Sequence, residues 1–280
     1  MEAQQRCRGS AGLFQCYGTA LGKSCLRLGT SKHYDEYIDV RDNYFTDEKS
    51  KLVFNLAMHD QLTSYFDGEM WRVCEGNQYF AIPQFDFLRG EYIVDAGAYV
   101  GDTLEQFLWH TISVFGHYWA FEPGKKQFEA LEKRVLRICD EWALDREIFT
   151  LVHAGVGDRD GKICDDRCIL GNNKTEFRLD PREVRTDFDG DGIAICSLDS
   201  FLEGKKVTLI KADIEGMEMN LLEGAKEIIK IQKPKLAICV YHLPCDLYCI
   251  AKRIRDINPD YQFVLRSHSK HYGELVLYCF

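Results

Sequence analysis

The fold is decided by one run of sequence, YIVDAGAYVGDT at residues 92–103. Residues 92–95 have the aromatic and β-branched character of a buried strand, and this strand stops at an aspartate. Gly97 and Gly101 follow in a turn where the backbone can approach a ligand closely. Residues 102–114 are predicted to form a helix. A strand, a glycine turn and a helix in this order indicate an open α/β sheet, in which ligands bind at the carboxyl edge.

The same alternation continues to the end of the chain. Helices are predicted over 125–138, 217–231 and 246–257, and further strands over 118–122, 149–156, 207–214, 235–241, 261–265 and 275–280. Strands that alternate with helices in this way predict a mostly parallel sheet with helices on both faces, which is an α/β fold.

Residues 1–90 lack this alternation, so we predict two regions. An N-terminal tail and helical extension over 1–90 is expected to cover the substrate edge of the sheet, and a ligand-binding domain occupies 91–280. Apolar residues recur at helical spacing between Asp47 and Phe66, with Asp47 as the expected cap. Residues 78–83 are interpreted as a short strand or extended arm. Residues 1–33 carry five bases and one acid, and are interpreted as a basic tail.

The composition narrows the class of protein. The chain has 280 residues and a formal net charge of −9 at pH 7. A strongly acidic chain repels phosphate backbones, so a general nucleic-acid binder is not expected. The 12 cysteines are scattered, which favours reduced thiols and a cytoplasmic protein. The polar stretch 157–192 is expected to be a surface loop, with a strong turn signal at 187–192 but without the ligand spacing of a calcium loop.

Acidic residues flank the first glycine turn. Asp95 and Asp102 place negative charge where a pyrophosphate would lie, and the glycine spacing is Gly-x-x-x-Gly. Both features argue against a dinucleotide and for a ligand with positive charge. Glu122, in Phe121-Glu122-Pro123 at the end of the next strand, can accept both hydrogen bonds of a ribose diol. The two motifs together predict a nucleoside-binding edge.

Three carboxylates follow a later strand, in IKADIEGME at residues 210–218. A run of acids at the carboxyl edge of a sheet is costly unless something uses it. By alternation, Asp213 is expected on the same side of the strand as Lys211 and Glu215. Glu218 opens the next helix, where the helix dipole favours an acid.

Two histidines near the C-terminus complete the candidate set. His242 follows the strand predicted over 235–241 and is a candidate general base, because the pKa of histidine lies near neutrality. In Leu265-Arg266-Ser267-His268, Arg266 either binds an anionic or polyol substrate or pairs with Glu274.

Residues 95–103, 121–123, 198–199 and 211–218 together resemble the FkbM-type S-adenosylmethionine-dependent methyltransferases. The C-terminal pattern of Tyr241-His242, Leu265-Arg266 and residues 274–278 is similar to a bacterial branch of that family, although Ser267 interrupts the Leu-Arg-His of that branch. The resemblance covers roughly residues 45–280. It implies a class I methyltransferase fold, which is Rossmann-like, with a seven-stranded sheet whose last strand is antiparallel. It also implies O-methylation of hydroxyls on sugars, glycoconjugates or polyketides.

The motifs and the resemblance together give expected roles to individual residues. S-adenosylmethionine is the expected cofactor and S-adenosylhomocysteine its product, with no metal. The expected partner is a small-molecule hydroxyl acceptor such as a sugar, and homo-oligomerisation is left open. The first candidate for general base is His242, followed by Asp213 and Glu215. The expected substrate-binding residues are Lys211, Glu218, Tyr241, Arg266 and His268. The expected cofactor-binding residues are Asp95, Ala96, Gly97, Tyr99, Gly101, Asp102, Thr103, Glu122 and Asp213.

Three alternatives stay open on the sequence alone. An NAD-dependent oxidoreductase would share the fold and Glu122, but the third glycine of its motif is missing. A non-catalytic binding protein with a methyltransferase fold would not need both sets of acids. A metal site is the third alternative, although the cysteines lack the spacing of a zinc knuckle. Its candidate ligands are Cys164 with Cys168, His242 with Cys245 and Cys249, or, for magnesium, Asp213, Glu215 and Glu218.

Overall fold

The computed structural model describes residues 32–63, 69–86, 89–164, 169–170, 177–178, 184–186, 192–270 and 273–280. The basic tail predicted over 1–33 lies outside this set except for its last two residues. The turn predicted at 187–192 lies outside it except for Gly192. Among the described helices, none combines the length and the apolar character needed to cross a membrane.

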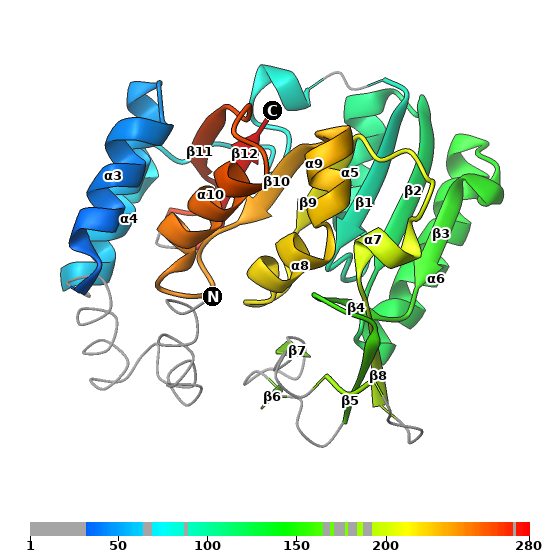
Figure 1. Cartoon of the computed structure of the whole chain (residues 1–280). Coiled ribbons are helices and arrows are strands. Elements are labelled where there is room, and N and C mark those ends of the chain that lie inside the picture. The colour runs from blue at the N-terminus through cyan, green and yellow to red at the C-terminus, as the bar shows by residue number, and fades with distance from the viewer. Residues whose placement is uncertain are drawn as a thin grey trace. The chain divides into compact units, whose positions relative to one another are not determined.

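The strands form a seven-stranded sheet in the order β11-β12-β10-β9-β1-β2-β3 (Figure 1). Neighbours β10, β9, β1, β2 and β3 pair in parallel, whereas β11 and β12 pair antiparallel. This confirms the predicted α/β class with a mostly parallel, seven-stranded sheet. The strands are β1 (Glu91–Ala96), β2 (Phe115–Phe121), β3 (Phe149–Val152), β9 (Leu209–Ala212), β10 (Lys235–Cys239), β11 (Phe263–Ser267) and β12 (Leu275–Cys279).

By its internal contacts the chain divides into two compact units. The larger unit is Tyr79–Ile238, and the smaller unit joins the residues up to Gln78 with Cys239–Phe280. The boundary expected near residue 90 was placed on composition, whereas this division follows packing. In the smaller unit, α3 (Tyr34–Tyr44) contacts α10 (Asp246–Ile257), and α4 (Glu48–Thr63) contacts β11. The N-terminal helices therefore group with the last strands of the chain.

The sequence explains two helices of the larger unit, α6 by its amphipathic pattern and α5 by the residues that flank its two ends. In α6 (Lys125–Trp142), the buried residues Leu131, Val135 and Ile138 recur at helical spacing. The helix α5 (Asp102–Thr111) begins after Gly101 and ends before Ile112, and both flanking residues have left-handed backbones. These helices confirm the two predicted over 102–114 and 125–138.

The single helix predicted over 217–231 is instead two helices, α8 (Glu218–Gly224) and α9 (Lys226–Gln232). The helix is interrupted at Ala225, next to a close contact between backbones. A Cβ added to Gly224 would lie 1.9 Å from the carbonyl oxygen of Gly157. The end of α8 therefore packs against backbone, and the following turn starts a new helix.

The stretch 157–192 is not the plain surface loop that was predicted. Strand β8 (Gly192–Cys196) pairs in parallel with β4 (Gly155–Val156) and antiparallel with β5 (Gly161–Cys164). Ile163, Val184 and Ile195 form the core of this small sheet. A further pair joins β6 (Ile169–Leu170) and β7 (Phe177–Arg178). The strand predicted over 149–156 is accordingly divided into β3 and β4.

In the smaller unit, α4 confirms the predicted helix, and α3 was not predicted. Asp47 caps α4 as expected, because its Oδ1 accepts a hydrogen bond from the Ser50 amide at 2.9 Å. The helix α3 has acids in its first turn and Arg41 in its last, which suits the helix dipole. Its Tyr37 is buried and packs against Phe54 and Tyr248. The helix α10 spans the same residues that were predicted.

Candidate functional site

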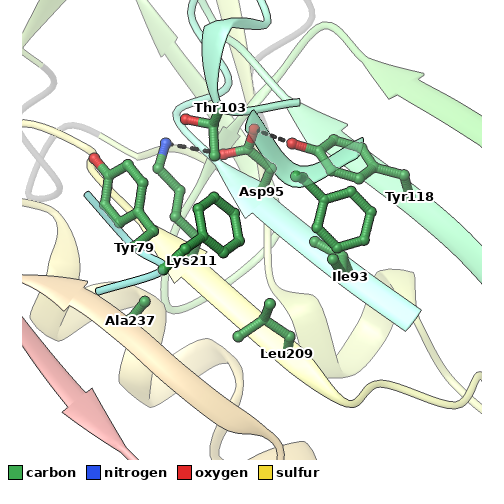
Figure 2. A pocket seen from close by; sticks show the side chains of 10 residues that line it. Tyr79, Ile93, Asp95, Thr103, Tyr118, Leu209, Lys211 and Ala237 are labelled. Atoms are coloured by element: carbon green, nitrogen blue, oxygen red, sulfur yellow. Dashed lines mark hydrogen bonds and ion pairs between the residues drawn. The ribbon is translucent and has the colours of Figure 1, made fainter. Parts of the chain in front are cut away.

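The carboxylate of Asp95, near the end of β1, is fully buried in an ion pair. Its Oδ1 lies 2.8 Å from Nζ of Lys211, and its Oδ2 accepts a hydrogen bond from the Tyr118 hydroxyl at 2.6 Å (Figure 2). The register of β1 and β9 places Asp95 opposite Lys211, so the two strands build the pair directly. Burial, followed by the charge of Asp95, raises the pKa of Tyr118 well above its usual value. The phenol therefore remains a hydrogen-bond donor to the carboxylate.

Lys211 connects this pair to the glycine turn. Its Nζ donates a hydrogen bond to the carbonyl oxygen of Gly97 at 2.7 Å. Because Lys211 is only 4% exposed and Asp95 is 0% exposed, both side chains support the turn from the protein interior. A substrate-binding role for Lys211 therefore remains a prediction, whereas its part in holding the turn follows from its contacts.

Figure 2 shows a small cavity around this ion pair. Its walls are largely apolar, so the pair has a low-dielectric surrounding in which hydrogen bonds and charge pairing matter more than in water. Ten residues line the cavity: Tyr79, Phe80, Ile93, Asp95, Thr103, Phe107, Tyr118, Leu209, Lys211 and Ala237.

The turn itself requires glycine at its first position. Gly97 has a φ of +76°, and a Cβ there would lie 1.9 Å from the carbonyl oxygen of Asp213. The Asp213 amide in turn donates to the carbonyl oxygen of Ala96 at 3.1 Å. The turns that follow β1 and β9 are thus in backbone contact. Tyr99 within the turn also has a left-handed backbone, with a φ of 48°, and its side chain is exposed.

Glu122 follows β2 and faces the same turn. Its Oε2 accepts a hydrogen bond from the Tyr99 amide at 2.9 Å, and its Oε1 accepts one from the Gly124 amide at 2.7 Å. Burial raises the pKa of Glu122 to about 7, partly offset by these amides and by Lys211. Each carboxylate oxygen can accept a second hydrogen bond. The group is therefore placed to receive a pair of hydroxyls.

Asp213, just after β9, is oriented by a residue that sequence reasoning missed. The Tyr79 hydroxyl donates to its Oδ2 at 2.9 Å. The ring of Tyr79 lies 5.2 Å from the ammonium of Lys211, which is cation–π distance. Tyr79 has a left-handed φ of 70° and is buried. No spacing in the sequence connects Tyr79 to Asp213, so no pattern could have revealed this contact.

The acids Glu215, Glu218 and Asp102 differ in backbone conformation, burial and contacts. Strand β9 ends at Ala212, and Glu215 has a φ of 57°, so the alternation expected from Lys211 to Glu215 does not extend to Glu215. Glu218 is 0% exposed, and its Oε1 accepts a hydrogen bond from the Ile214 amide at 2.9 Å. Glu218 therefore closes the turn before α8. Asp102 is exposed in the first turn of α5.

The remaining predicted residues belong to the smaller unit. His242 follows β10 and is 3% exposed, and its ring centroid lies 4.2 Å from that of Tyr241. His268 lies 3.0 Å through Nδ1 from the carbonyl oxygen of Glu75 and 2.9 Å through Nε2 from the hydroxyl of Tyr278. Burial lowers the pKa of His268. The contacts at its two ring nitrogens give this histidine a fixed orientation.

Arg266 does not pair with Glu274, although this ion pair was one of the two roles predicted for Arg266. It forms ion pairs with Asp47 at 3.0 Å and Glu75 at 3.2 Å. The register of β11 and β12 explains this, because Arg266 lies opposite Val276. Glu274 accepts a hydrogen bond from the hydroxyl of Tyr241 at 3.4 Å.

The predicted residues thus form two groups, one in each unit. The larger unit brings together the cofactor-binding candidates with Lys211, Glu215 and Glu218, and the smaller unit contains Tyr241, His242, Arg266 and His268. Of the cysteine ligands considered for a metal, Cys168 lies outside the described residues, and Cys245 and Cys249 are at the start of α10.

A parallel sheet with a glycine turn after β1, an acid after β2 and an acid after β9 fits a protein of the methyltransferase class. The family described as "Methyltransferase FkbM domain" matches residues 95–265. The chain belongs to the FkbM methyltransferase family. This confirms the family expected from the sequence motifs.

One solved structure agrees with this assignment. The chain is similar to the methyltransferase FkbM from Methylobacillus flagellatus KT, with 25% identity and a TM-score of 0.73 over 91% of this chain. It spans 60% of the length of that protein. Weaker likeness extends to an Aeropyrum pernix fibrillarin with bound S-adenosyl-L-methionine, at 12% identity and a TM-score of 0.41 over 72% of this chain and 71% of that one. A comparison with curated proteins gives no match.

Proposed function

We propose that the chain is an S-adenosylmethionine-dependent methyltransferase that methylates a hydroxyl of a small-molecule acceptor, such as a sugar or glycoconjugate. The observation that supports it best is the position of Glu122, a buried carboxyl group hydrogen-bonded to the turn that contains Gly97 and Tyr99. Membership of the FkbM family supports methyl transfer. The acceptor class rests on the resemblance of the sequence motifs.

The residues of the larger unit fit such a cofactor. Glu122 retains acceptor capacity on both oxygens for the two hydroxyls of a ribose. Asp213 is partly exposed and held by Tyr79, so its charge is available to a cationic group. When bound, S-adenosylmethionine supplies a methyl group on a positively charged sulfonium. The carboxylates favour that cation over its neutral product, which would assist product release.

The contribution of the protein is positioning and proton transfer. Gly97 and Gly101 allow the turn to pack closely against the Asp213 backbone and against α6, and the Asp95–Lys211 pair keeps the turn in place. The acceptor oxygen must be held about 3–3.5 Å from the methyl carbon, which is the reacting distance of a near-attack arrangement. His242 is the proposed group that accepts the hydroxyl proton, a step worth roughly 10²–10⁴-fold. Asp213 and Glu215 are the next candidates for that step.

Calorimetry with S-adenosylhomocysteine tests the cofactor assignment. The wild-type chain should bind, and Glu122→Gln should weaken binding by about 10- to 100-fold, because hydrogen bonds to charged groups contribute about 1.5–3 kcal/mol. Glu129→Gln is the matched control, since Glu129 is an exposed acid on α6. Its affinity should equal that of the wild type. A folded wild-type chain that binds NADH and not S-adenosylhomocysteine would overturn the proposal.

A transfer assay then tests the acceptor class. The chain is incubated with methyl-labelled S-adenosylmethionine and a panel of nucleotide sugars, glycoconjugates and phenols. Label should appear in an ether linkage on a sugar hydroxyl. Tight cofactor binding with no transfer to any hydroxyl compound would instead support a non-catalytic binding protein.

A further inference from the structure

The larger unit contains a second hollow, which has no part in the proposed methyl transfer. It is an open depression with a volume of about 420 Å³, within the range of small-molecule sites. Tyr92 is the second residue of β1, Thr150 the second of β3 and His117 the third of β2, so the hollow lies toward the amino ends of these strands. By alternation it is on the sheet face opposite Ile93, Asp95 and Tyr118.

One wall of this hollow is aromatic. The ring centroid of Trp119 lies 4.4 Å from that of His117 and 6.5 Å from that of Tyr92, with interplanar angles of 38° and 29°. Gly116 makes this arrangement possible, because a Cβ there would lie 2.4 Å from the ring of Tyr92. His117 is held by Nε2 at 2.8 Å from Oγ1 of Thr150. The wall is therefore built from three neighbouring rings, with those of Tyr92 and His117 tilted by 29° and 38° from Trp119.

The other side of the hollow is positively charged. Phe201, the last residue of α7 (Leu198–Phe201), lines the hollow together with Lys205 and Lys206 of the segment that follows it. Both lysines are exposed, and neither forms an ion pair with any carboxylate in the described part of the chain. Nζ of Lys206 lies 4.9 Å from the centre of the Tyr92 ring. In a chain of net charge −9, two lysines without acidic partners create a local positive potential that favours an anion.

The state of His117 agrees with this electrostatic setting. Burial, followed by the charge of Lys205, lowers the pKa of His117, and no carboxylate acts on it. The imidazole is therefore neutral at pH 7 and belongs to the aromatic wall. The positive charge at the hollow comes from the lysines alone.

We propose that this hollow binds a planar aromatic anion, with its ring against Tyr92 and the exposed edge of Trp119, and its acidic group at Lys205 and Lys206. An offset-stacked ring suits the wall, and an ammonium group is a point charge that accepts carboxylate, sulfonate or phosphate alike. An uncharged ring would not engage the lysines, and an anion without a ring would leave the wall unused. The ligand must therefore combine both features.

A pair of dyes tests both features. The anionic probe 8-anilinonaphthalene-1-sulfonate and the uncharged N-phenyl-1-naphthylamine share a ring system and differ in the sulfonate. The full chain is titrated with each dye, with and without saturating S-adenosylhomocysteine. The anionic probe should bind saturably in both conditions and at least tenfold more tightly than the uncharged one. Because this readout does not need the cofactor, it is independent of the proposed methyl transfer.

A double variant assigns the binding to the lysines. Lys205→Gln with Lys206→Gln should weaken the anionic probe at least tenfold and leave the uncharged dye unchanged. The matched control is Lys226→Gln with Lys230→Gln, which removes two exposed charges from α9. Equal weakening in both double variants, equal affinity for both dyes, or no saturable binding would overturn the proposal.

Displacement then distinguishes the sources of the acidic group. With S-adenosylhomocysteine present, adenosine 5′-monophosphate should displace the bound probe at the lower concentration if the site prefers a phosphate. Indole-3-acetate should do so at the lower concentration if the site prefers a carboxylate. Failure of both compounds to displace the probe would contradict a site for planar aromatic anions.

Discussion

Glu122 has a carboxyl group whose ionisation the fold disfavours. Burial raises its pKa from the ordinary value of 4.5 to about 7. Between these two pH values the folded chain binds more protons than the unfolded chain, so the free energy of unfolding falls as pH rises through this window. The contribution is at most about 3 kcal/mol, from a shift of this size.

Urea unfolding of the ligand-free chain at pH 5, 6, 7 and 8 measures this effect. The wild type should lose stability across the window relative to Glu122→Gln, in which the titrating group is absent. The comparison uses the difference between the two proteins at each pH, so that other titrating groups cancel. Parallel pH profiles for the two proteins would show that Glu122 ionises freely in the fold.

The Asp95–Lys211 pair gives a second prediction for single residues. Lys211→Met leaves Asp95 fully buried without its partner, and removal of one member of a buried pair costs about 3–5 kcal/mol. Asp95→Asn in the same chain removes the unpaired charge and retains an acceptor for Tyr118. The double variant should therefore unfold at a higher urea concentration than Lys211→Met alone. Additive losses from the two substitutions would contradict a coupled pair.

His242 gives a third prediction, about turnover. Its substitution by alanine removes the proposed proton acceptor. It leaves the glycine turn unchanged. His242→Ala should keep the affinity for S-adenosylhomocysteine and lose about 10²–10⁴-fold in kcat. Calorimetry and the labelled-methyl assay measure the two quantities on one preparation. Unchanged kcat would remove His242 from the mechanism and leave Asp213 and Glu215 as candidates.

At the scale of elements, the contact between the turns after β1 and β9 is the most sensitive to substitution. Gly97→Ala combines a left-handed φ with a Cβ 1.9 Å from the Asp213 carbonyl oxygen. Gly204→Ala has a similar φ of +69° but no atom within 4 Å of the added Cβ. We expect about 1–2 kcal/mol of destabilisation at Gly204, from backbone strain alone, and several kcal/mol more at Gly97. Urea unfolding of both variants measures the difference, and equal losses would contradict the contact.

Elements with a long, regular pattern were predictable from the sequence. The helix α10 and the helix α6 each have apolar residues at helical spacing over three or more turns, and both were found where expected. The strands β5 and β8 were missed because each is short and finds its partner across a long stretch of chain. The end of α8, just before the break, packs against the backbone of Gly157, which is far from it in sequence. Such contacts leave no local periodicity.

For the candidate site, the sequence predicted which residues lie at the sheet edge but not how they contact one another. Asp95 and Glu122 end neighbouring strands, so their position at one sheet edge follows from topology. The pairing of Asp95 with Lys211 needs the register of β1 and β9, which the sequence does not specify. The contact of Tyr79 with Asp213 needs the path of the chain before β1.

At the scale of the whole molecule, ligand binding should act on one of the two compact units. The residues proposed to hold the cofactor all belong to Tyr79–Ile238. With S-adenosylhomocysteine at 100 times its Kd, these residues should gain up to about 2.7 kcal/mol of protection against hydrogen exchange. Mass spectrometry should detect it in peptides that cover 95–103, 121–124 and 211–218. Protection confined to the residues after Cys239 would contradict the proposed location.

Three residues around the site, Tyr79, Tyr99 and Glu215, have left-handed backbones although none is glycine. Each such position costs about 1–3 kcal/mol in the folded chain. Glycine at any of them would relieve that cost, but Tyr79 would lose its hydroxyl and Tyr99 its fixed amide direction toward Glu122. A laboratory selection for heat resistance alone would therefore favour replacements at these positions. The resulting enzyme would survive higher temperatures and hold its cofactor less well, so the two properties should be selected together.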